Sequence, residues 1–370
     1  MIKILAYGMT SNFGGIEVYL VNLLKNIDKN KIKIDYVIFG EKSPFEQEIT
    51  ANGGEIFYIP NKSKGIIKNI KIIRKLLKKS SKTYDCIYFN SGALFYAVPY
   101  FMAWIYNFKN IIVHAHNGKD PNRSVWEVAL HKFNRTVINH IADYKFSCSD
   151  IATEWIFGKK YVGNKSIYKI NNAVDCNKYK YLYEKRKVLC NELNINEDAF
   201  IIGNVARLDS QKNHSFLLKI FKEILKSNET SILLIIGDGA LKDSLIKQAE
   251  KMNISKSVLF LGLRKDIHDL LNTMDIFVLT SLFEGFPITL VEAQVNGLPC
   301  FVSNTVTKEV NITGLIEYIS LDDSPKKWAD EILSKFYNYK RKSYYSEMCN
   351  FGYDLKSNTN KIEKIFMNMK

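Results

Sequence analysis

Along nearly all of this chain of 370 residues, short β-rich runs alternate with stretches of helical pattern, and the series starts twice. Such alternation predicts parallel sheets with helices on both faces. The first series of predicted strands comprises Ile2–Tyr7, Lys33–Phe39, Glu55–Ile59, Cys86–Asn90, Ile111–His116, Lys145–Ser147 and Tyr168–Asn171. The second series comprises Phe200–Val205, Ser231–Ile236, Val258–Leu261, Ile276–Leu279 and Cys300–Val302. We therefore predict an α/β protein with two Rossmann-like, doubly wound domains.

The length agrees with this division, because 370 residues exceed one small core and fit two domains of ordinary size. A connector rich in Tyr and Lys, Cys176–Asp198, separates the two series. We place an N-terminal domain at residues 1–178, a C-terminal domain at 179–354 and a last helix at 355–370. The opening MIKILAYG has one lysine and a short apolar run, which predicts a first strand and not a signal peptide.

The net charge of +14 is unevenly distributed. Residues 1–175 hold 25 Lys and Arg against 14 Asp and Glu, an excess of +11, and the remainder carries +3. An acidic partner would explain the basic half, and the candidates are a nucleic acid or an anionic membrane.

Two segments of the basic half could contact a membrane. Lys62–Lys82 holds nine Lys and Arg and no acid, with apolar residues at helical spacing (Ile66, Ile70, Ile73, Leu77), so it predicts a basic amphipathic helix. That helix could equally pack on the sheet with a solvated basic face. Gly92–Phe108 is uncharged over 17 residues but contains Pro99, and is too short for a convincing membrane span. It is either a buried helix or an interfacial segment.

The cysteines show no C-x-x-C pair and no metal-ligand spacing with the six histidines. We therefore expect reduced, buried thiols in a cytoplasmic protein. They are Cys86, Cys148, Cys176, Cys190, Cys300 and Cys349.

The most informative motif holds two carboxylates, Glu284 and Glu292, around a Gly-Phe-Pro turn. On one continuous helix they would lie about 12 Å apart along the axis, too far for the roughly 5–5.5 Å carboxyl pair of a retaining glycosidase. We expect Glu284 on a loop and a helix that begins near Ile288. The backbone from Gly285 to Thr289 would then face an anion, and Glu292 would be free to accept from a sugar diol. This arrangement suits a nucleoside diphosphate-sugar.

The residues Glu284, Gly285, Phe286, Pro287 and Glu292 resemble the signature of glycosyltransferase family 4, whose members are retaining enzymes. The resemblance spans nearly the whole chain and looks closest to bacterial exopolysaccharide and capsule glycosyltransferases. It implies the GT-B fold, in which two Rossmann-like domains face a central cleft and a C-terminal helix crosses back to the first domain.

Two cations, Arg207 and Lys212, follow the strand Phe200–Val205, and the carboxyl end of a strand is where open α/β sheets bind ligands. Breaking a sugar–phosphate bond builds negative charge on the diphosphate, which fixed cations can stabilise. Family 4 has an Arg and a Lys five residues apart at this place. A surface salt bridge is the alternative interpretation.

Glycines end two further strands of the second series. Gly237 and Gly239 follow one strand, and Gly262 and Arg264 follow the next. Each is a common turn by itself, but together they match the nucleotide-binding side of the family. The resemblance implies that the backbone around Leu263 and Arg264 borders the base.

In the first domain, Gly15 lies in a Gly-Gly turn after the first strand, where the family binds near the diphosphate and the acceptor. His114 and His116 lie two apart and therefore share a face of their strand. No third metal ligand lies nearby in sequence. In the family such a histidine contacts the donor sugar, and we assign this role to His116, which we expect to be the more exposed, with His114 second. Ala173 replaces a glycine that is usual in the family, which weakens any role there.

The resemblance thus implies a metal-independent, retaining transfer from a nucleotide-sugar, with UDP-sugar preferred, to a lipid-linked glycan. Glu284 would contact the donor sugar and Glu292 the ribose, while the departing phosphate helps to deprotonate the acceptor. The implied catalytic residues are Glu284, His116, Arg207 and Lys212. The implied donor-binding residues are Gly15, Arg207, Lys212, Gly237, Gly239, Leu263, Arg264, Gly285, Phe286, Pro287, Ile288, Thr289 and Glu292.

Two other functions stay open at this point. A nucleotide-sugar 2-epimerase of the same fold would also bind a UDP-sugar but would use no acceptor. A basic nucleic-acid-binding protein would explain the charge but would leave the phosphate-binding loops unexplained and shows no recognised motif. We expect no nucleic acid, no cofactor, and an enzyme at the cytoplasmic face of the cell membrane.

Overall fold

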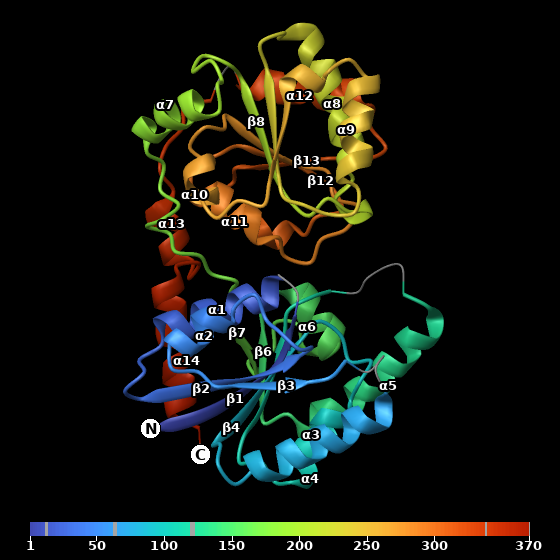
Figure 1. Cartoon of the computed structure of the whole chain (residues 1–370), viewed down its shortest axis with the longest axis vertical. Helices are drawn as coiled ribbons and strands as arrows, with labels where there is room; N and C mark the ends of the chain where they lie inside the picture. Colours follow the sequence, from blue (N-terminus) through green and yellow to red (C-terminus); the bar gives the residue numbers. More distant parts are fainter. Residues whose placement is uncertain (12–13, 62–64, 119–122, 337–338, 370) are drawn as a thin grey trace. The chain divides into compact units, whose positions relative to one another are not determined.

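The computed structural model describes residues 1–11, 14–61, 65–118, 123–336 and 339–369. The chain forms two compact units, Met1–Ala173 with Leu355–Lys370, and Val174–Asp354 (Figure 1). The sequence placed the change of domain at residue 178. In the structure the second unit already starts at Val174, because this residue forms a parallel bridge with Asp354 and its N–H donates to the carbonyl of Tyr353 at 3.0 Å.

The first unit contains all seven strands that the sequence predicted, with ends that differ by up to three residues. They are β1 Ile2–Thr10, β2 Ile32–Phe39, β3 Ile56–Ile59, β4 Cys86–Ser91, β5 Ile111–Ala115, β6 Tyr144–Ser147 and β7 Ile167–Lys169. All pairs are parallel, in the order β3-β2-β1-β4-β5-β6-β7. The central strands are near-continuous apolar runs, as expected for strands that are covered on both faces.

Helices cover both faces of this sheet (Figure 1). They are α1 Gly15–Asn26, α2 Glu46–Ala51, α3 Ile66–Ser80, α4 Val98–Ile105, α5 Val125–Ile141, α6 Asp150–Ile156, the short 3-10 helix η2 Lys159–Tyr161 and α14 Leu355–Met367. Helices α1, α2 and α14 share one core, in which Ile362 and Phe366 of α14 are buried. Helices α3 to α6 cover the other face. The last helix therefore completes the core of the first unit.

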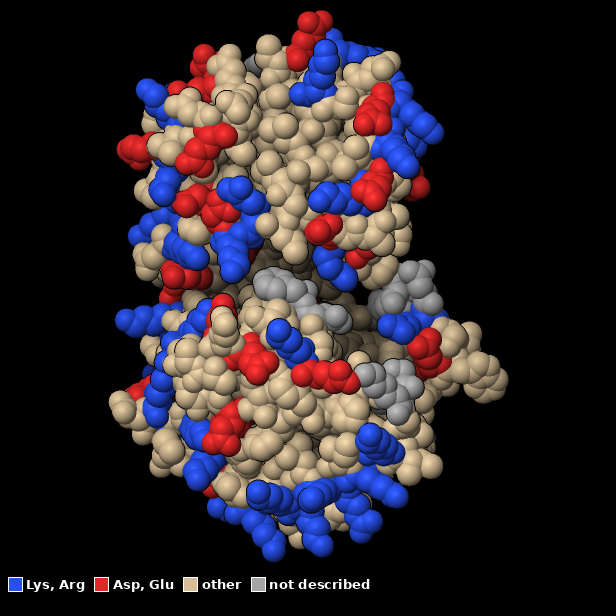
Figure 2. Space-filling view, viewed as in Figure 1, with Lys and Arg blue, Asp and Glu red and all other residues tan. Residues whose placement is uncertain are grey.

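Helix α3 carries the part of the basic run that the structure describes, since residues 62–64 lie outside the described residues. Its inner side holds Ile73 and Leu77, which are buried in the core. Ile66, expected on the same apolar stripe, is 53% exposed. The outer side is a row of Lys and Arg, visible along the lower edge of the first unit in Figure 2.

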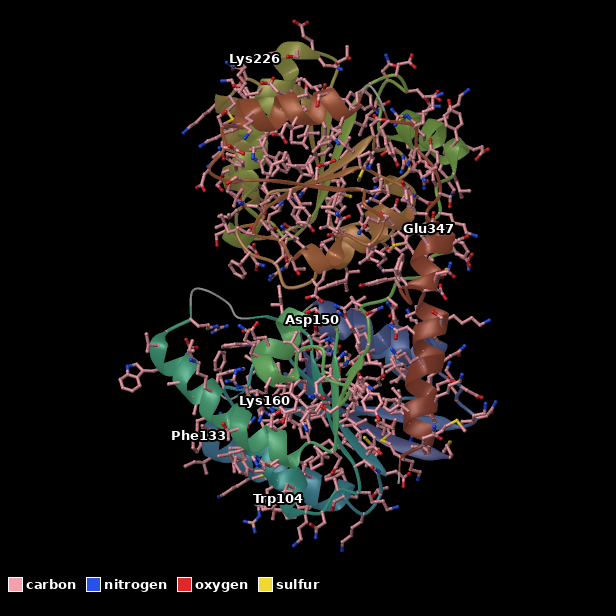
Figure 3. All side chains as sticks on the ribbon, turned by 180° about the vertical axis from the view of Figure 1, so that it is seen from behind. Trp104, Phe133, Asp150, Lys160, Lys226 and Glu347 are labelled. Atoms are coloured by element: carbon pink, nitrogen blue, oxygen red, sulfur yellow. The ribbon has the colours of Figure 1, made fainter. Side chains whose placement is uncertain are left out.

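The uncharged segment Gly92–Phe108 is not one long helix. Only α4 is helical, and Tyr100 and Ala103 point into the core. Trp104 and Ile105, at the end of α4, are exposed, and Figure 3 labels Trp104 at this place. The segment is thus buried on one side and apolar at the surface on the other. No helix within the described ranges combines the length and the hydropathy needed to cross a bilayer.

The second unit contains the five predicted strands and one more. They are β8 Ile201–Val205, β9 Ile232–Ile236, β10 Val258–Gly262, β11 Ile276–Leu279, β12 Cys300–Ser303 and the additional β13 Ile316–Ile319. The parallel sheet has the order β10-β9-β8-β11-β12-β13. The order reverses between β8 and β11, and ligands of open α/β sheets bind beyond the carboxyl ends of the strands at this switch point.

Helices again cover both faces. They are α7 Tyr183–Glu192, α8 His214–Ser227, α9 Lys242–Lys251, α10 Ile267–Leu270, α11 Ile288–Val295, α12 Pro325–Phe336 and α13 Tyr345–Asn350, with 3-10 turns η3 Ser210–Lys212, η4 Ser255–Ser257 and η5 Lys308–Val310. Helices α8, α9 and α12 pack on one face, and α10, α11 and α13 on the other.

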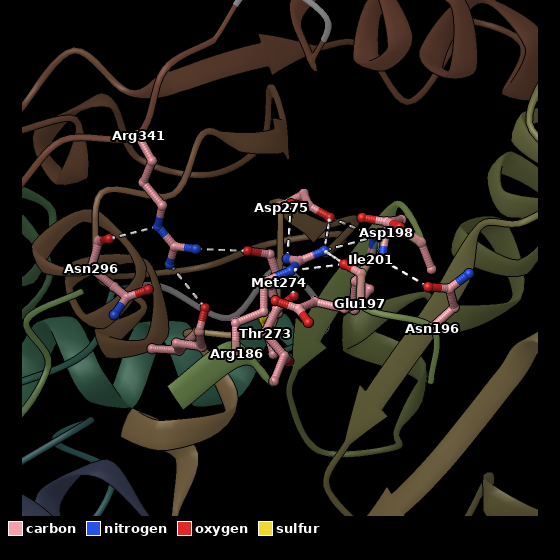
Figure 4. Close-up of polar contacts among 12 residues, drawn as sticks. Arg186, Asn196, Glu197, Asp198, Ile201, Thr273, Met274, Asp275, Asn296 and Arg341 are labelled. Atoms are coloured by element: carbon pink, nitrogen blue, oxygen red, sulfur yellow. Dashed lines mark hydrogen bonds and ion pairs between the residues drawn. The ribbon is translucent and has the colours of Figure 1, made fainter. Parts of the chain in front are cut away.

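Two arginines form hydrogen bonds near the amino-terminal ends of the strands in this sheet (Figure 4). Arg186 of α7 pairs with Asp275, just before β11, at 3.0 Å, and donates to the carbonyl of Thr273 at 2.6 Å. Arg341 donates to three backbone carbonyls, at Asn296, Met274 and Leu271. Burial lowers the pKa of Arg341 to about 10, so it stays charged near neutral pH. These bonds hold the edge opposite to the switch point.

Candidate functional site

The ends of β8 and β11 bring together two of the residues that the sequence proposed. The Lys212 ammonium forms an ion pair with the Glu284 carboxylate, which also accepts from the Ser281 hydroxyl at 2.7 Å. The two charged side chains are 15% and 8% exposed. The sequence placed these residues in separate roles, but the structure joins them in one nearly buried pair at the switch point of the sheet.

The loops that carry this pair are bonded to each other. The Thr280 hydroxyl, just after β11, donates to the carbonyl of Lys212 at 3.2 Å, and the N–H of Leu282 donates to Gln211 at 2.7 Å. Gln211 in turn donates its side-chain amide to the carbonyl of Phe283 at 2.9 Å. The position of Lys212 opposite Glu284 is therefore fixed by hydrogen bonds to backbone carbonyls that do not depend on the ion pair.

Arg207, the second predicted cation, does not join the pair. Its side chain is 68% exposed and contacts Asp209 at 3.3 Å. It lies at the carboxyl end of β8 and keeps its guanidinium in solvent. Of the two cations, Lys212 is nearly buried in an ion pair, and Arg207 is exposed beside Asp209.

Helix α11 begins at Ile288, where the sequence placed it, after Pro287 and without a side-chain cap. Backbone N–H groups at an uncapped helix start attract anions. The side chain of Phe286 is buried and stacks on Tyr353 with ring centroids 5.9 Å apart. The side chain of Phe286 therefore anchors the segment from Gly285 to Thr289 in the core. The backbone of this segment is the part that a ligand would contact.

The sequence suggested that the Glu292 carboxylate is free, but in the structure it accepts a hydrogen bond. The Tyr179 hydroxyl donates to Glu292 Oε1 at 2.7 Å. Burial raises the pKa of Glu292 to about 7, and the hydrogen bond from Tyr179 acts in the opposite direction. Glu292 would thus titrate near neutral pH. Tyr179 was missed because it lies 113 residues away, in a connector whose pattern predicts only an irregular segment.

The glycines after β9 are required by packing. A side chain on Gly237, at φ +141°, would bring its Cβ to 1.9 Å from the carbonyl oxygen of Ala206. A Cβ on Gly239 would lie 2.5 Å from the oxygen of Leu208. Both contacts are with the exit of β8, so these glycines shape the loop that carries Arg207 and Lys212.

The predicted base-binding edge follows β10. Leu263 is 76% exposed, and Arg264 forms a two-bond pair with Asp266, at 2.8 and 2.5 Å. Its guanidinium is therefore already engaged by a neighbouring carboxylate. The exposed Leu263 and the fixed guanidinium of Arg264 form a flat, partly apolar surface that an aromatic ring can contact.

In the first unit, His114 and His116 lie together, as their spacing predicted, with ring centroids 4.0 Å apart. His116 is the more exposed of the two, as expected, but at 5% against 0% for His114 it is still buried, and its Nε2 bonds the side-chain oxygen of Asn90 at 2.9 Å. Burial lowers the pKa of His116 to about 3, so the ring is neutral at physiological pH. His114 bonds the hydroxyl of Tyr88 through Nδ1 at 2.6 Å.

Gly15 is the first residue of α1, and a Cβ on it would meet no atom within 4 Å. Packing therefore does not demand a glycine at this position. Glu17, two residues further along α1, is buried and accepts from the N–H and hydroxyl of Thr10, at 2.9 and 2.8 Å. These hydrogen bonds hold the start of α1 against the end of β1.

One group of potential metal ligands occurs among the described residues. The ligand atoms of Cys176, Cys349 and Asp354 lie within 4.8 Å of one another. Cys349 is partly exposed, so the expectation of six buried thiols is wrong for this residue. Spacing rules could not find the group, because tertiary folding joins the two ends of the second unit.

Comparisons with known proteins agree with this geometry. Residues 185–347 match the family model described as glycosyl transferases group 1. The chain is 28% identical over 365 residues to the "Putative glycosyltransferase EpsF" of Bacillus subtilis, which covers 96% of this chain and 94% of that protein. It is 31% identical over 217 residues to the UDP-Gal:alpha-D-GlcNAc-diphosphoundecaprenol alpha-1,3-galactosyltransferase of Escherichia coli, over 56% of each chain.

Among solved structures, HepE of Anabaena in complex with UDP superposes with a TM-score of 0.80 at 18% identity, over 99% of this chain and 100% of HepE. This likeness extends over both units. The chain has the GT-B fold of glycosyltransferases, and its residues 185–347 carry the sequence pattern of glycosyl transferases group 1.

Proposed function

We propose that this protein is a retaining glycosyltransferase that moves a sugar from a UDP-sugar to a growing, lipid-linked glycan of the cell surface. The observation that carries the proposal is the Lys212–Glu284 pair at the switch point, inside the region that matches the group 1 model. The relative from Escherichia coli is named for a UDP-Gal donor and a diphosphoundecaprenol acceptor, and HepE was solved with UDP, which supports this choice of substrates.

In this proposal the donor diphosphate lies between Lys212, Arg207 and the start of α11. An ammonium has three donors, and Glu284 engages one of them, so Lys212 can hold Glu284 and a phosphate oxygen together. Glu284 keeps a second oxygen for the hydroxyls of the donor sugar. The nearly buried site strengthens each of these charged hydrogen bonds relative to water.

The reaction needs stabilisation of the leaving diphosphate more than a covalent partner. As the bond between sugar and phosphate breaks, negative charge grows on the phosphate oxygens, and groups that are already oriented stabilise it without reorganisation. The acceptor hydroxyl would attack from the same face that the diphosphate leaves, and a phosphate oxygen would take its proton. We therefore propose that the configuration is retained and that no metal or other cofactor takes part.

Glu292 is proposed to receive the ribose hydroxyls, and Leu263 with Arg264 to border the base. The hydrogen bond from Tyr179 leaves Glu292 with a second oxygen for a ribose hydroxyl. We propose that His116, which is buried and neutral, acts by fixing Asn90 at the end of β4 and not as an acid or a base. We keep Gly15 as a point of backbone approach to the ligand.

The proposal places the enzyme at the cytoplasmic face of the cell membrane, because a lipid-linked acceptor is held there. The excess of positive charge in the first half of the chain and the basic outer side of α3 support an anionic surface as partner. The alternative of a 2-epimerase is not favoured, since the similar proteins are named as transferases.

A donor screen tests this function. The full chain would be incubated with a panel of UDP-sugars and a diphospholipid acceptor, and released UDP and glycan product would be measured. We expect one donor to be consumed only with acceptor present, and the product to keep the anomeric configuration of the donor by NMR. Lys212→Ala should abolish most of the turnover, and Lys219→Ala, an exposed lysine of α8, should not.

Three outcomes would contradict the proposal in different parts. An inverted product would exclude retention. Isomerised UDP-sugar without transfer would select the epimerase. Normal turnover in Lys212→Ala would show that the diphosphate binds elsewhere.

A further inference from the structure

Helix α5 exposes an apolar stripe that no part of the proposed donor site uses. Trp126, Leu130 and Phe133 follow one another at spacings of four and three residues, so they lie on one side of the helix. They are 85%, 46% and 68% exposed, and Val125 beside them is 83% exposed. Figure 3 shows Phe133 on the outer side of the helix. We call Trp126, Leu130 and Phe133 the α5 stripe.

The stripe is not needed to hold α5 on the protein. The inner side of the helix is already occupied by His131, Asn134 and Ile138, all buried, and His131 stacks on Trp155 with ring centroids 3.6 Å apart. The helix start is fixed by a capping box, in which Ser124 and Glu127 bond each other's backbone N–H. The stripe therefore belongs to an ordered helix that presents large apolar side chains to water, which marks an interaction surface.

Basic and apolar residues continue this surface on the neighbouring helices. Helix α4 packs against both α3 and α5 and ends with the exposed Trp104 and Ile105. Arg74 of α3 donates to the hydroxyl of Tyr106 at 3.2 Å, which ties the basic helix to this end of α4. The outer side of α3 carries six cations and no acid: Lys68, Lys71, Arg74, Lys75, Lys78 and Lys79.

We propose that the α5 stripe, together with Trp104 and Ile105 of α4, inserts into an anionic lipid bilayer while α3 contacts the headgroups. The inference deepens the proposed function, because a lipid-linked acceptor would lie in that bilayer. Tryptophan favours the boundary between lipid and water, and cationic residues beside apolar anchors bind anionic membranes reversibly where either alone would be marginal. A purely apolar face would suit a protein partner equally, but a flanking helix of six cations complements phospholipid headgroups.

The tryptophans allow a direct test on the full chain. Trp126 and Trp104 are exposed, and Trp155 and Trp328 are buried, so the emission of the exposed pair should shift to shorter wavelength on vesicles that contain phosphatidylglycerol. In Trp104→Phe, brominated lipid should still quench the emission, since Trp126 remains. In Trp126→Phe the quenching should weaken.

Co-sedimentation with the same vesicles measures the affinity. We expect the double variant Trp126→Ser with Phe133→Ser to bind at least tenfold more weakly. Lys71→Glu with Lys75→Glu and Lys78→Glu should remove binding at low salt. The control Val188→Ser removes an exposed apolar residue, 54% exposed, from α7 of the second unit and should bind like the wild type. Vesicles of phosphatidylcholine alone should bind weakly.

We call the double variant Trp126→Ser with Phe133→Ser the α5 variant. Unchanged sedimentation and quenching in the α5 variant would overturn the proposal, as would equal binding of the wild type to neutral vesicles. A lipid-free dimer that the α5 variant converts to a monomer would show that the stripe binds a second copy of the chain instead. Release of UDP with a soluble acceptor should be the same in the α5 variant and the wild type. Vesicle binding without any sugar transfer would reject the proposed function and leave the membrane contact standing.

Discussion

The Lys212–Glu284 pair makes a strong prediction at the scale of single residues. Lys212→Ala should lower kcat by on the order of 10²–10³-fold, because an oriented cation is lost where charge develops. It should also lower the free energy of unfolding by about 3 kcal/mol, because a nearly buried carboxylate is left without its partner. Arg207→Ala, at an exposed side chain, should reduce turnover and leave stability within about 0.5 kcal/mol.

Kinetics and thermal unfolding together check this pair. The double variant Lys212→Met with Glu284→Gln should recover stability but not turnover, which separates the two effects. Near-normal rates in both single variants, with any active donor, would refute the diphosphate assignment.

Glu292 predicts a pH dependence. Its pKa is raised to about 7 in the folded protein, from an ordinary value near 4.5. The folded state therefore holds the proton more tightly, so this contribution to stability is complete below about pH 4.5 and is lost as the pH rises through 7. The Gln side chain in Glu292→Gln cannot ionise. As the pH rises from about 4.5 to 7, the free energy of unfolding of this variant should therefore increase relative to that of wild type by on the order of 2–3 kcal/mol.

Tyr179 offers a second variant for the same titration. Its hydrogen bond acts to lower the pKa of Glu292, so Tyr179→Phe should move the midpoint above that of wild type. Denaturant unfolding across pH 4 to 9 would show the shift. A flat difference between wild type and Glu292→Gln over this range would contradict the raised pKa.

Sequence patterns identified Lys212, Glu284 and Glu292 one by one, because each follows a strand or starts a helix. They could not show that Lys212 and Glu284 neutralise each other, or that Tyr179 engages Glu292, since both pairs join residues more than 70 positions apart. The histidines show the same limit. Their common face followed from the period of a strand, but their burial depends on Tyr19 and Asn90 from other elements.

At the scale of elements, the alternation of strands and helices predicted both sheets, and strand ends differed by only a few residues. The strand β13 was missed because Ile316–Ile319 is four residues long, contains Glu317 and is buried only at its ends. It was thus too short and too polar to stand out from a turn. The strand forms because its backbone pairs with β12, and the local sequence does not show this pairing.

Substitutions of two glycines test how closely the chain packs at the end of β9 and at the start of α1. Gly237→Ala should destabilise the protein by at least about 2 kcal/mol, because its φ is +141° and the new Cβ would clash with Ala206. Gly15→Ala should change stability by less than about 0.5 kcal/mol, since the new Cβ meets no atom at the start of α1. Thermal denaturation compares them. A stable Gly15→Ala variant with reduced turnover would indicate backbone approach to a ligand, whereas equal destabilisation of both would contradict the packing account.

The whole molecule should work without a metal. The proposed site holds the diphosphate with Lys212, Arg207 and the start of α11, so turnover should be the same before and after treatment with EDTA. Chelation could alter stability through Cys176, Cys349 and Asp354, the group of potential ligands identified above. Turnover and melting temperature should therefore be followed together. Loss of activity that manganese or magnesium restores would contradict the proposed chemistry.

The path of the chain through the two units has a practical consequence. The second unit is one uninterrupted stretch, and its ends, Val174 and Asp354, meet in a bridge. The first unit is completed only when α14 returns after that stretch. The second unit is therefore a cassette with adjoining entry and exit points. Exchange of this cassette with that of a relative would need two neighbouring junctions and would preserve the host core, so a chimera built there should fold and take its proposed donor site from the relative.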